Sequence, residues 1–274
     1  MLFLMAQHVA YIHLKYSIII LFLVHSMVAH ASDSLFTRIS VAHTFFTTDV
    51  YNNIYCITPD NEIVRYGLNG TRVTFSNLKY GKPSTVDAGN PLKTMVYYAD
   101  LQTLVILDKM LADIAVLRFS NINGTSYRPS VVCRASGGDH IWLFDELSQR
   151  VVRLDETGNL IAMSEPWYQL NIDAGTPVWM QSAQDQVYIY TSSGILHIFD
   201  AFGTWSKSFE IHSQPLDIVQ QQLLLNDEAG LHLFDLQTTQ EVFLPITCAG
   251  TTVHMQPNYL YCGNGTEISV YRIR

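Results

Sequence analysis

Short apolar runs separated by polar turn residues dominate the chain from about residue 32 onward. The clearest runs are NIYCI, TMVYY, HIWLF, QVYIY, QLLL and YLYC. Each is rich in aromatic or branched side chains and is followed within three residues by Asp, Asn, Gly or Ser, which is typical of β-strands and their turns. The pattern predicts an all-β protein.

The runs recur at a nearly constant spacing. They begin near Ile54, Met95, Ile141, Val187, Leu223 and Leu260, at intervals of 41, 46, 46, 36 and 37 residues. A strand-rich repeat of about 40 residues is the signature of a β-propeller, whose blades are four-stranded antiparallel sheets. We therefore predict a six-bladed propeller, because the interval 119–133 is too short to hold another blade.

The stretch 141–161, IWLFDELSQRVVRLDETGNLI, shows the order of strands and turns within one repeat. IWLFD and RVVRLD are two strands joined by the turn ELSQ, and ETG leads into the outer strand. The acidic residues Asp145, Glu146, Asp155 and Glu156 fall at the turns. We expect them to form turns through Asx-type hydrogen bonds rather than to act as catalytic acids.

The innermost strand of each blade and the closure of the ring can also be predicted. Proline opens the segment before four of the repeats, at Pro83, Pro129, Pro177 and Pro215. Proline suits the entry to an edge strand because it cannot donate to a ladder. The chain stops without an outer strand for its last blade, and LFTRIS near residue 35 is a spare strand. We expect this N-terminal strand to complete the last blade and remove an open sheet edge.

The first residues, 1–31, resemble a secretory signal peptide. Lys15 is the single charged residue among them, an apolar run follows it, and the small-x-small sequence AHA ends at Ala31. We expect cleavage there, leaving a single propeller domain, 32–274, that is exported to the periplasm or cell envelope. The alternative is a retained membrane anchor, because the apolar stretch approaches the roughly 20 residues of a spanning helix.

Charge excludes one class of partner. The chain carries 16 Lys plus Arg against 24 Asp plus Glu, a net charge of −8. An acidic domain without clustered Lys or Arg lacks the electrostatic footprint of a nucleic-acid binder. No cofactor motif or metal site is predicted either: His197 and His232 occupy equivalent third strands of neighbouring blades, away from the axis, where repeats place equivalent residues.

Three segments resemble a known family. These are GNPLKTMVYYADLQTLVILDKML, HIWLFDELSQRVVRLDETGNL and GILHIFDAFG, which are similar to segments of exported propeller proteins widespread in Bacteroidota. The resemblance implies a propeller in the bacterial envelope. It implies no activity and carries over no functional residues.

The junction GNPLK offers a weak candidate loop for a ligand or partner. It joins the first and second strands of its blade, where propeller surfaces often bind ligands, and Lys93 could present a cation. The alternative is that Asn90 and Pro91 only set the turn.

Two further sets of residues are candidates. Cys248 and Cys262 flank the turn HMQPN, where a hairpin would set them face to face as a disulfide, or as two small apolar residues in adjacent strands. Asp87 and Asp217 lie in predicted inner strands. They could form a carboxylate pair for glycoside chemistry, or bind backbone amides of neighbouring blades.

Two functions are consistent with these features. The first is a non-enzymatic exported propeller that serves as a rigid platform for an envelope protein or peptide. The alternative is a hydrolase or lyase acting on a glycan or peptide at the mouth of the axial channel. Because propellers host both classes, the lining of the channel has to separate them. Convergent carboxylates or histidines would favour the enzyme, and apolar filling would favour the platform.

Overall fold

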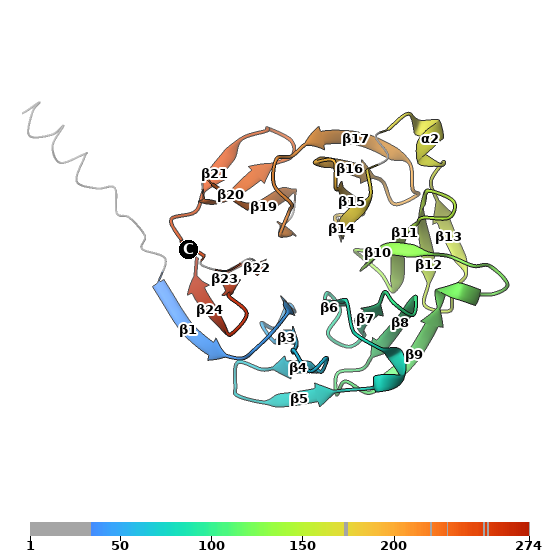
Figure 1. Ribbon diagram of the computed structural model, residues 1–274. Helices are drawn as coiled ribbons and strands as arrows, with labels where there is room; N and C mark the ends of the chain where they lie inside the picture. The colour runs from blue at the N-terminus through green and yellow to red at the C-terminus, as the bar shows by residue number, and fades with distance from the viewer. Residues whose placement is uncertain are drawn as a thin grey trace, which may run out of the picture. The chain divides into compact units, whose positions relative to one another are not determined.

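A computed structural model describes residues 34–172, 175–219, 221–228, 230–248, 250 and 252–273. In this part of the chain, six four-stranded antiparallel sheets form a ring (Figure 1). Each sheet is one blade of a β-propeller, so the predicted fold class and number of blades are confirmed. The predicted signal segment, 1–31, lies outside the described residues. Among the described helices, none is long and apolar enough to cross a membrane.

The blades follow one another along the chain, and each starts with its innermost strand. Blade 1 comprises β2 (Phe45–Thr48), β3 (Ile54–Ile57), β4 (Ile63–Tyr66) and β5 (Arg72–Phe75). Blade 2 comprises β6 (Thr85–Asp87), β7 (Thr94–Tyr98), β8 (Thr103–Leu107) and β9 (Asp113–Arg118). Blade 3 comprises β10 (Pro129–Arg134), β11 (His140–Asp145), β12 (Arg150–Asp155) and β13 (Leu160–Met163).

The second half of the ring repeats this order. Blade 4 comprises β14 (Pro177–Ala183), β15 (Gln186–Thr191), β16 (Ile195–Phe199) and β17 (Trp205–Glu210). Blade 5 comprises β18 (Asp217–Val219), β19 (Gln222–Asp227), β20 (Gly230–Asp235) and β21 (Glu241–Phe243). Blade 6 comprises β22 (Thr252–Gln256), β23 (Tyr259–Gly263), β24 (Glu267–Arg272) and β1 (Ser34–Ser40). Short helical turns η1 (Leu78–Tyr80), η2 (Phe119–Asn121) and α2 (Trp167–Leu170) lie in connections between blades.

The N-terminal strand closes the ring as predicted. β1 pairs antiparallel with β24, from Ser34 opposite Arg272 to Ser40 opposite Glu267. The ends of the propeller domain are therefore joined through backbone hydrogen bonds within one sheet, and β24 presents no open edge.

Of the four acidic residues predicted to form turns, Asp145 and Asp155 do so, whereas Glu146 and Glu156 lie beside Arg128 and Lys93. Asp155 accepts hydrogen bonds from the backbone amides of Thr157 and Asn159, each at 2.8 Å. Asp145 accepts from the amides of Arg128 and Ser148 at 2.7 and 3.0 Å. Asp155 therefore binds amides of its own turn, whereas Asp145 also binds the amide of Arg128 just before β10.

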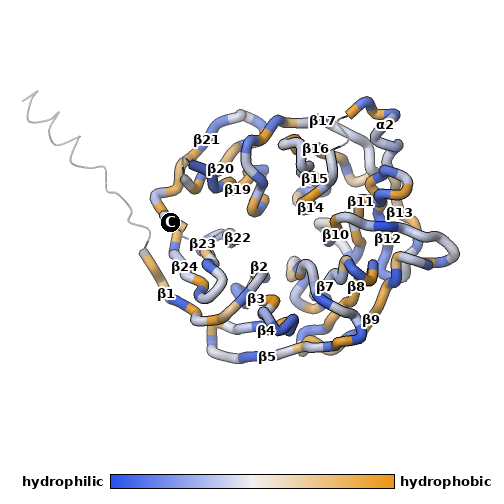
Figure 2. The backbone as a smooth tube through the Cα atoms, in the orientation of Figure 1, coloured by the Kyte–Doolittle hydropathy of each residue, from blue (hydrophilic) through white to orange (hydrophobic). Residues whose placement is uncertain are grey.

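The hydrophobic core lies between blades. Six clusters of buried side chains occur, one at each junction of neighbouring blades. Apolar residues accordingly run along the strands of every blade in Figure 2. At the junction of blades 3 and 4, Trp167 packs 4.5 Å from Phe144 and 6.1 Å from Phe199, measured between ring centroids. Large flat side chains thus hold sheet against sheet.

The topology gives the ring two different faces. In each antiparallel blade the first-to-second and third-to-fourth turns emerge at the same end, which we call the hairpin face; it includes the turns 49–53, 67–71, 88–93 and 108–112. The second-to-third turns and the connections between blades emerge at the opposite end, the connection face, which includes η1 and α2.

Candidate functional site

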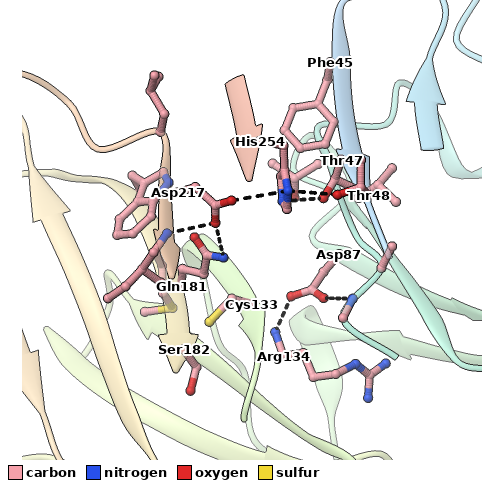
Figure 3. Close-up of a pocket in the computed structure, with 18 of the residues that line it drawn as sticks. Phe45, Thr47, Thr48, Asp87, Cys133, Arg134, Gln181, Ser182, Asp217 and His254 are labelled. Carbon is pink, nitrogen blue, oxygen red and sulfur yellow. Dashed lines mark hydrogen bonds and ion pairs between the residues drawn. The ribbon is translucent and has the colours of Figure 1, made fainter. Parts of the chain in front are cut away.

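The inner strands surround a cavity of about 600 Å³. All six contribute to its lining: β2, β6, β10, β14, β18 and β22. This volume falls in the range of small-ligand pockets, roughly 300–1,000 Å³. Apolar side chains such as Phe45, Val131 and Met180 alternate around it with Thr, Ser, Gln, Asp and His side chains (Figure 3). The channel is therefore a mixed polar and apolar site rather than an apolar plug.

A carboxylate, an imidazole and two hydroxyls meet on its wall (Figure 3). Asp217 Oδ2 lies 3.3 Å from His254 Nδ1. Thr47 Oγ1 lies 3.0 Å from His254 Nε2, and Thr48 Oγ1 lies 3.0 Å from Nδ1. These residues come from the inner strands of blades 5, 6 and 1, so the group spans the junction where the two ends of the domain meet.

The position of the proton on the His254 ring decides the direction of these hydrogen bonds. A neutral imidazole has one N–H and one acceptor nitrogen. Nδ1 faces two oxygens, Asp217 Oδ2 at 3.3 Å and Thr48 Oγ1 at 3.0 Å. In the tautomer with the proton on Nδ1, which a facing carboxylate favours, Nε2 accepts a hydrogen bond from the Thr47 hydroxyl.

Asp217 also ties three blades together. Its Oδ2 accepts from the backbone amide of Met255 at 2.9 Å, and its Oδ1 accepts from Gln181 Nε2 and from its own neighbour Ile218 N, both at 2.8 Å. The side chain is 2% exposed. This is the amide-binding role that inner-strand aspartates were expected to have.

Asp87 has the same arrangement at the junction of blades 2 and 3. Its two carboxylate oxygens accept from the backbone amides of Gly89 and Arg134 at 2.9 and 2.8 Å. Asp87 and Asp217 therefore both lie in inner strands, as predicted, and each binds an amide of the following blade. These contacts match the amide-binding alternative rather than a pair of catalytic acids.

Lys93, proposed from the sequence as a cation for a ligand, is held by two carboxylates. Its Nζ lies 2.5 Å from Asp139 Oδ2 and 2.7 Å from Glu156 Oε2, both in blade 3. Hydrogen bonds to Asp139 and Glu156 raise the pKa of Lys93, and the same contact with Lys93 lowers the pKa of Asp139. The side chain fastens blade 2 to blade 3.

Arg134 joins the same cluster. Its side chain is only 7% exposed and lies 3.6 Å from Asp139 and 3.9 Å from Glu156, while its guanidinium donates to the carbonyl of Lys93. Two cations thus face two carboxylates at the edge of the channel. The charge of Arg134, a residue of the cavity lining, is therefore matched by these carboxylates.

The other residues of the GNPLK junction form its turn. Asn90 Oδ1 accepts from the amide of Leu92 at 3.0 Å, and Asn90 Nδ2 donates to Asp139 at 3.3 Å. Pro91 lies inside this turn, between β6 and β7. A ligand role for Asn90, Pro91 and Lys93 stays a prediction.

Cys248 and Cys262 come together, but not in the way the sequence suggested. Their Cα atoms lie 5.5 Å apart, and their sulfurs are within bonding distance. Cys262, in β23, faces Val253 across the hairpin, and Cys248 precedes β22. The expected face-to-face register is wrong, because the turn is tighter than the spacing of the cysteines implied. The bond would join the entry of blade 6 to its second strand.

The two remaining cysteines are buried. Burial raises the pKa of Cys56 to about 12 and holds the pKa of Cys133 well above its ordinary value. Cys133 lines the channel, but a thiol that stays protonated is a poor nucleophile and metal ligand.

Exposed apolar side chains gather on the hairpin face of blades 1 and 2. We call them the hairpin-face patch; they are Val50, Tyr51, Leu68, Leu92 and Met110, with exposed fractions of 64, 70, 48, 62 and 59%. All five lie in turns of this face, and Val50 also lines the channel. Val50 therefore connects this face with the cavity.

Sequence reasoning missed the group of Thr47, His254 and Asp217. Thr47 and His254 are 207 residues apart, and nothing local distinguishes either from other polar residues of inner strands. One feature of the sequence could have indicated the group. Each of the three residues lies in an innermost strand, and the innermost strands of all blades face one another around the axis of a propeller.

Comparisons with known proteins bear on the fold. No protein-family model matches the chain, and no curated protein matches it in sequence. Among solved structures, it is similar to the β-propeller domain of Cps50 (Swd1) from Myceliophthora thermophila, with a TM-score of 0.59 and 9% identity over 88% of this chain and 100% of that one. It is also similar to BBS1N in complex with ARL6DN, with a TM-score of 0.58 and 11% identity over 88% and 97%.

A third similar structure is an enzyme. It is a catalytically inactive variant of virginiamycin B lyase from Staphylococcus aureus with quinupristin, with a TM-score of 0.57 and 12% identity over 84% of this chain and 80% of that one. At such identities the likeness concerns the fold alone, and these neighbours include both protein-bound propellers and an enzyme. The chain is a six-bladed β-propeller.

Proposed function

We propose that this protein is a binding platform of the bacterial cell envelope, which takes a peptide segment of a partner protein on its hairpin face. The observation that carries the proposal is the hairpin-face patch, five apolar side chains that are each about half or more exposed, of which Val50 lines the channel. Apolar side chains gathered around a concavity are typical of interaction sites. The signal-like segment 1–31 supports the envelope location.

The charges around the channel indicate the chemistry of the peptide. Asp87 and Asp217 line the cavity, whereas the nearby cations Arg134 and Lys93 are matched by Asp139 and Glu156. The whole chain carries −8. A peptide with an apolar residue next to a basic one complements this surface, with the apolar side chain on the patch and the cation at the channel mouth.

Selection of peptides on the purified protein tests the proposal. A random peptide library is panned against the immobilised full chain, and binding of the enriched peptides is measured by fluorescence polarisation. Tyr51→Asp places a charge in the patch and removes an aromatic contact of the kind that carries about 2 kcal/mol in interfaces, so we expect binding at least about tenfold weaker.

Leu78→Asp is the matched control. Leu78 is 87% exposed but lies in η1 on the connection face. We expect this variant to bind like the wild type, within about twofold. Failure to enrich any peptide, or an equal loss in Leu78→Asp, would overturn the proposal.

A further inference from the structure

We infer that Thr47 and His254 form a nucleophile and general-base pair, positioned by Asp217, that transfers the acyl group of a neutral or cationic ester bound in the channel. The inference goes beyond peptide binding on the hairpin face and does not depend on it. It rests on two contacts that link a hydroxyl, an imidazole and a carboxylate in the order needed for activation of an alcohol.

The geometry gives each group one role. Thr47 Oγ1 is 3.0 Å from His254 Nε2, within the hydrogen-bond reach required of a general base. Asp217 Oδ2 lies 3.3 Å from Nδ1 on the other side of the ring. In the tautomer with the proton on Nδ1, beside the carboxylate, the lone pair of Nε2 points at the hydroxyl that it would deprotonate. Thr47 and His254 are therefore the catalytic residues, and Asp217 is a positioning residue.

Asp217 is itself rigidly held. Hydrogen bonds from Gln181, Ile218 and Met255 fix the carboxylate, and Thr48 supports the imidazole from the Nδ1 side. A base whose orientation is determined by a buried, fully bonded carboxylate needs little reorganisation during a reaction.

The reaction would proceed in two balanced steps. Thr47 Oγ1 attacks the ester carbonyl carbon and gives its proton to His254 Nε2; the bond to the leaving oxygen breaks, and that proton passes to the released alcohol. Water then attacks the acyl carbon and gives one proton to Nε2. The bond from the acyl carbon to Oγ1 breaks, Thr47 regains its proton from Nε2, and the acid is released.

The surroundings determine the class of substrate. Phe45, Met180 and Val253 give the cavity apolar wall for an acyl chain. Asp87 and Asp217 disfavour an anionic substrate. A neutral ester with a short apolar acyl group fits these conditions.

The test uses p-nitrophenyl butyrate and the full chain. We expect release of p-nitrophenolate and, after rapid acid quench, a protein heavier by one butyryl group that peptide mapping places on Thr47. Thr47→Val keeps the shape of the side chain and removes the nucleophile, so we expect the rate to fall at least about a hundredfold. His254→Gln should lose the adduct as well.

Thr85→Val is the control, because Thr85 also lines the channel, from β6, and takes no part in the contacts of His254 described above. We expect its rate to remain within about threefold of the wild type. Hydrolysis by Thr47→Val at the wild-type rate, absence of an acyl adduct in the wild type, or an adduct on another residue would overturn the inference. If Thr47→Val fails to fold, the position of the adduct in the wild type decides. Peptide binding and the acyl adduct on Thr47 are separate measurements, so failure of the peptide site and failure of this one are distinguishable.

Discussion

Replacing Trp167 with alanine tests how the blades are held together. Trp167 is 1% exposed and lies in α2, the connection between blades 3 and 4. Its ring contacts Phe144, Phe199 and, with centroids 4.9 Å apart, His197. Because the buried Trp167 Nε1 has no hydrogen-bond acceptor among the residues that the structure describes, the substitution there removes packing and no side-chain hydrogen bond.

The magnitude follows from the buried area. A buried aromatic side chain of this size removes roughly 200–250 Å² from water, which at about 25 cal/mol/Å² gives an upper limit of about 5–6 kcal/mol. Measured truncations of buried Phe and Trp cost about 3–5 kcal/mol. We expect Trp167→Ala to lower the free energy of unfolding by about 4 kcal/mol, and the melting temperature by roughly 8–16 °C for a domain of this size.

Urea unfolding followed by far-ultraviolet circular dichroism measures this loss, since the signal does not depend on the tryptophan itself. Tyr168→Ala is the matched control: Tyr168 is the next residue in α2 but is 66% exposed. We expect its free energy of unfolding to stay within about 0.5 kcal/mol of the wild type. A loss below about 1 kcal/mol for Trp167→Ala, or equal losses for both variants, would show that the inter-blade clusters are not what stabilises the ring.

Two other predictions concern the cysteines and the turns. Without reductant, Ellman's reagent should find no reactive thiol in the native protein, because Cys56 and Cys133 are buried with a raised pKa, and two thiols after unfolding in guanidinium; four would contradict the Cys248–Cys262 bond. Partial burial raises the pKa of Asp155, but hydrogen bonds from Thr157 and Asn159 outweigh it and lower the pKa from 3.8 to about 2. A carboxyl with a lowered pKa stabilises the fold above pH 3.8 and loses that contribution as the pH falls towards 2, so the stability difference between wild type and Asp155→Asn should be larger at pH 6 than at pH 2. A difference that does not change with pH would refute the role of the Asp155 turn.

The blades and their turns were predictable because their causes are local. Alternating apolar runs form strands, Asp155 and similar residues bind amides two and four positions ahead, and the repeat of about 40 residues sets the number of sheets. Closure by β1 was predictable as well. The last blade lacked its outer strand and the N-terminal segment offered one, so pairing the two covers an open sheet edge.

The candidate sites were only partly predictable. The sequence placed Asp87 and Asp217 in inner strands and Lys93 at a junction turn, but it did not show that Asp139 and Glu156 of the next blade neutralise Lys93. The sequence also predicted that Cys248 and Cys262 lie close together, but it paired them directly across the hairpin, whereas Cys262 faces Val253. The register depends on the length of the turn, which residue types determine poorly.

The contact of Asp217, His254 and Thr47 belongs to the tertiary structure alone. Local propensities decide which residues form strands and turns, so the sequence by itself determined the blades, their order and the way in which the ring closes. The three side chains come from three blades, and their meeting depends on how far each blade rotates about the axis as the inter-blade clusters pack. That packing is a collective property of residues as far apart as Thr47 and His254, and only the closed ring places a hydroxyl, an imidazole and a carboxylate within hydrogen-bond distance of one another.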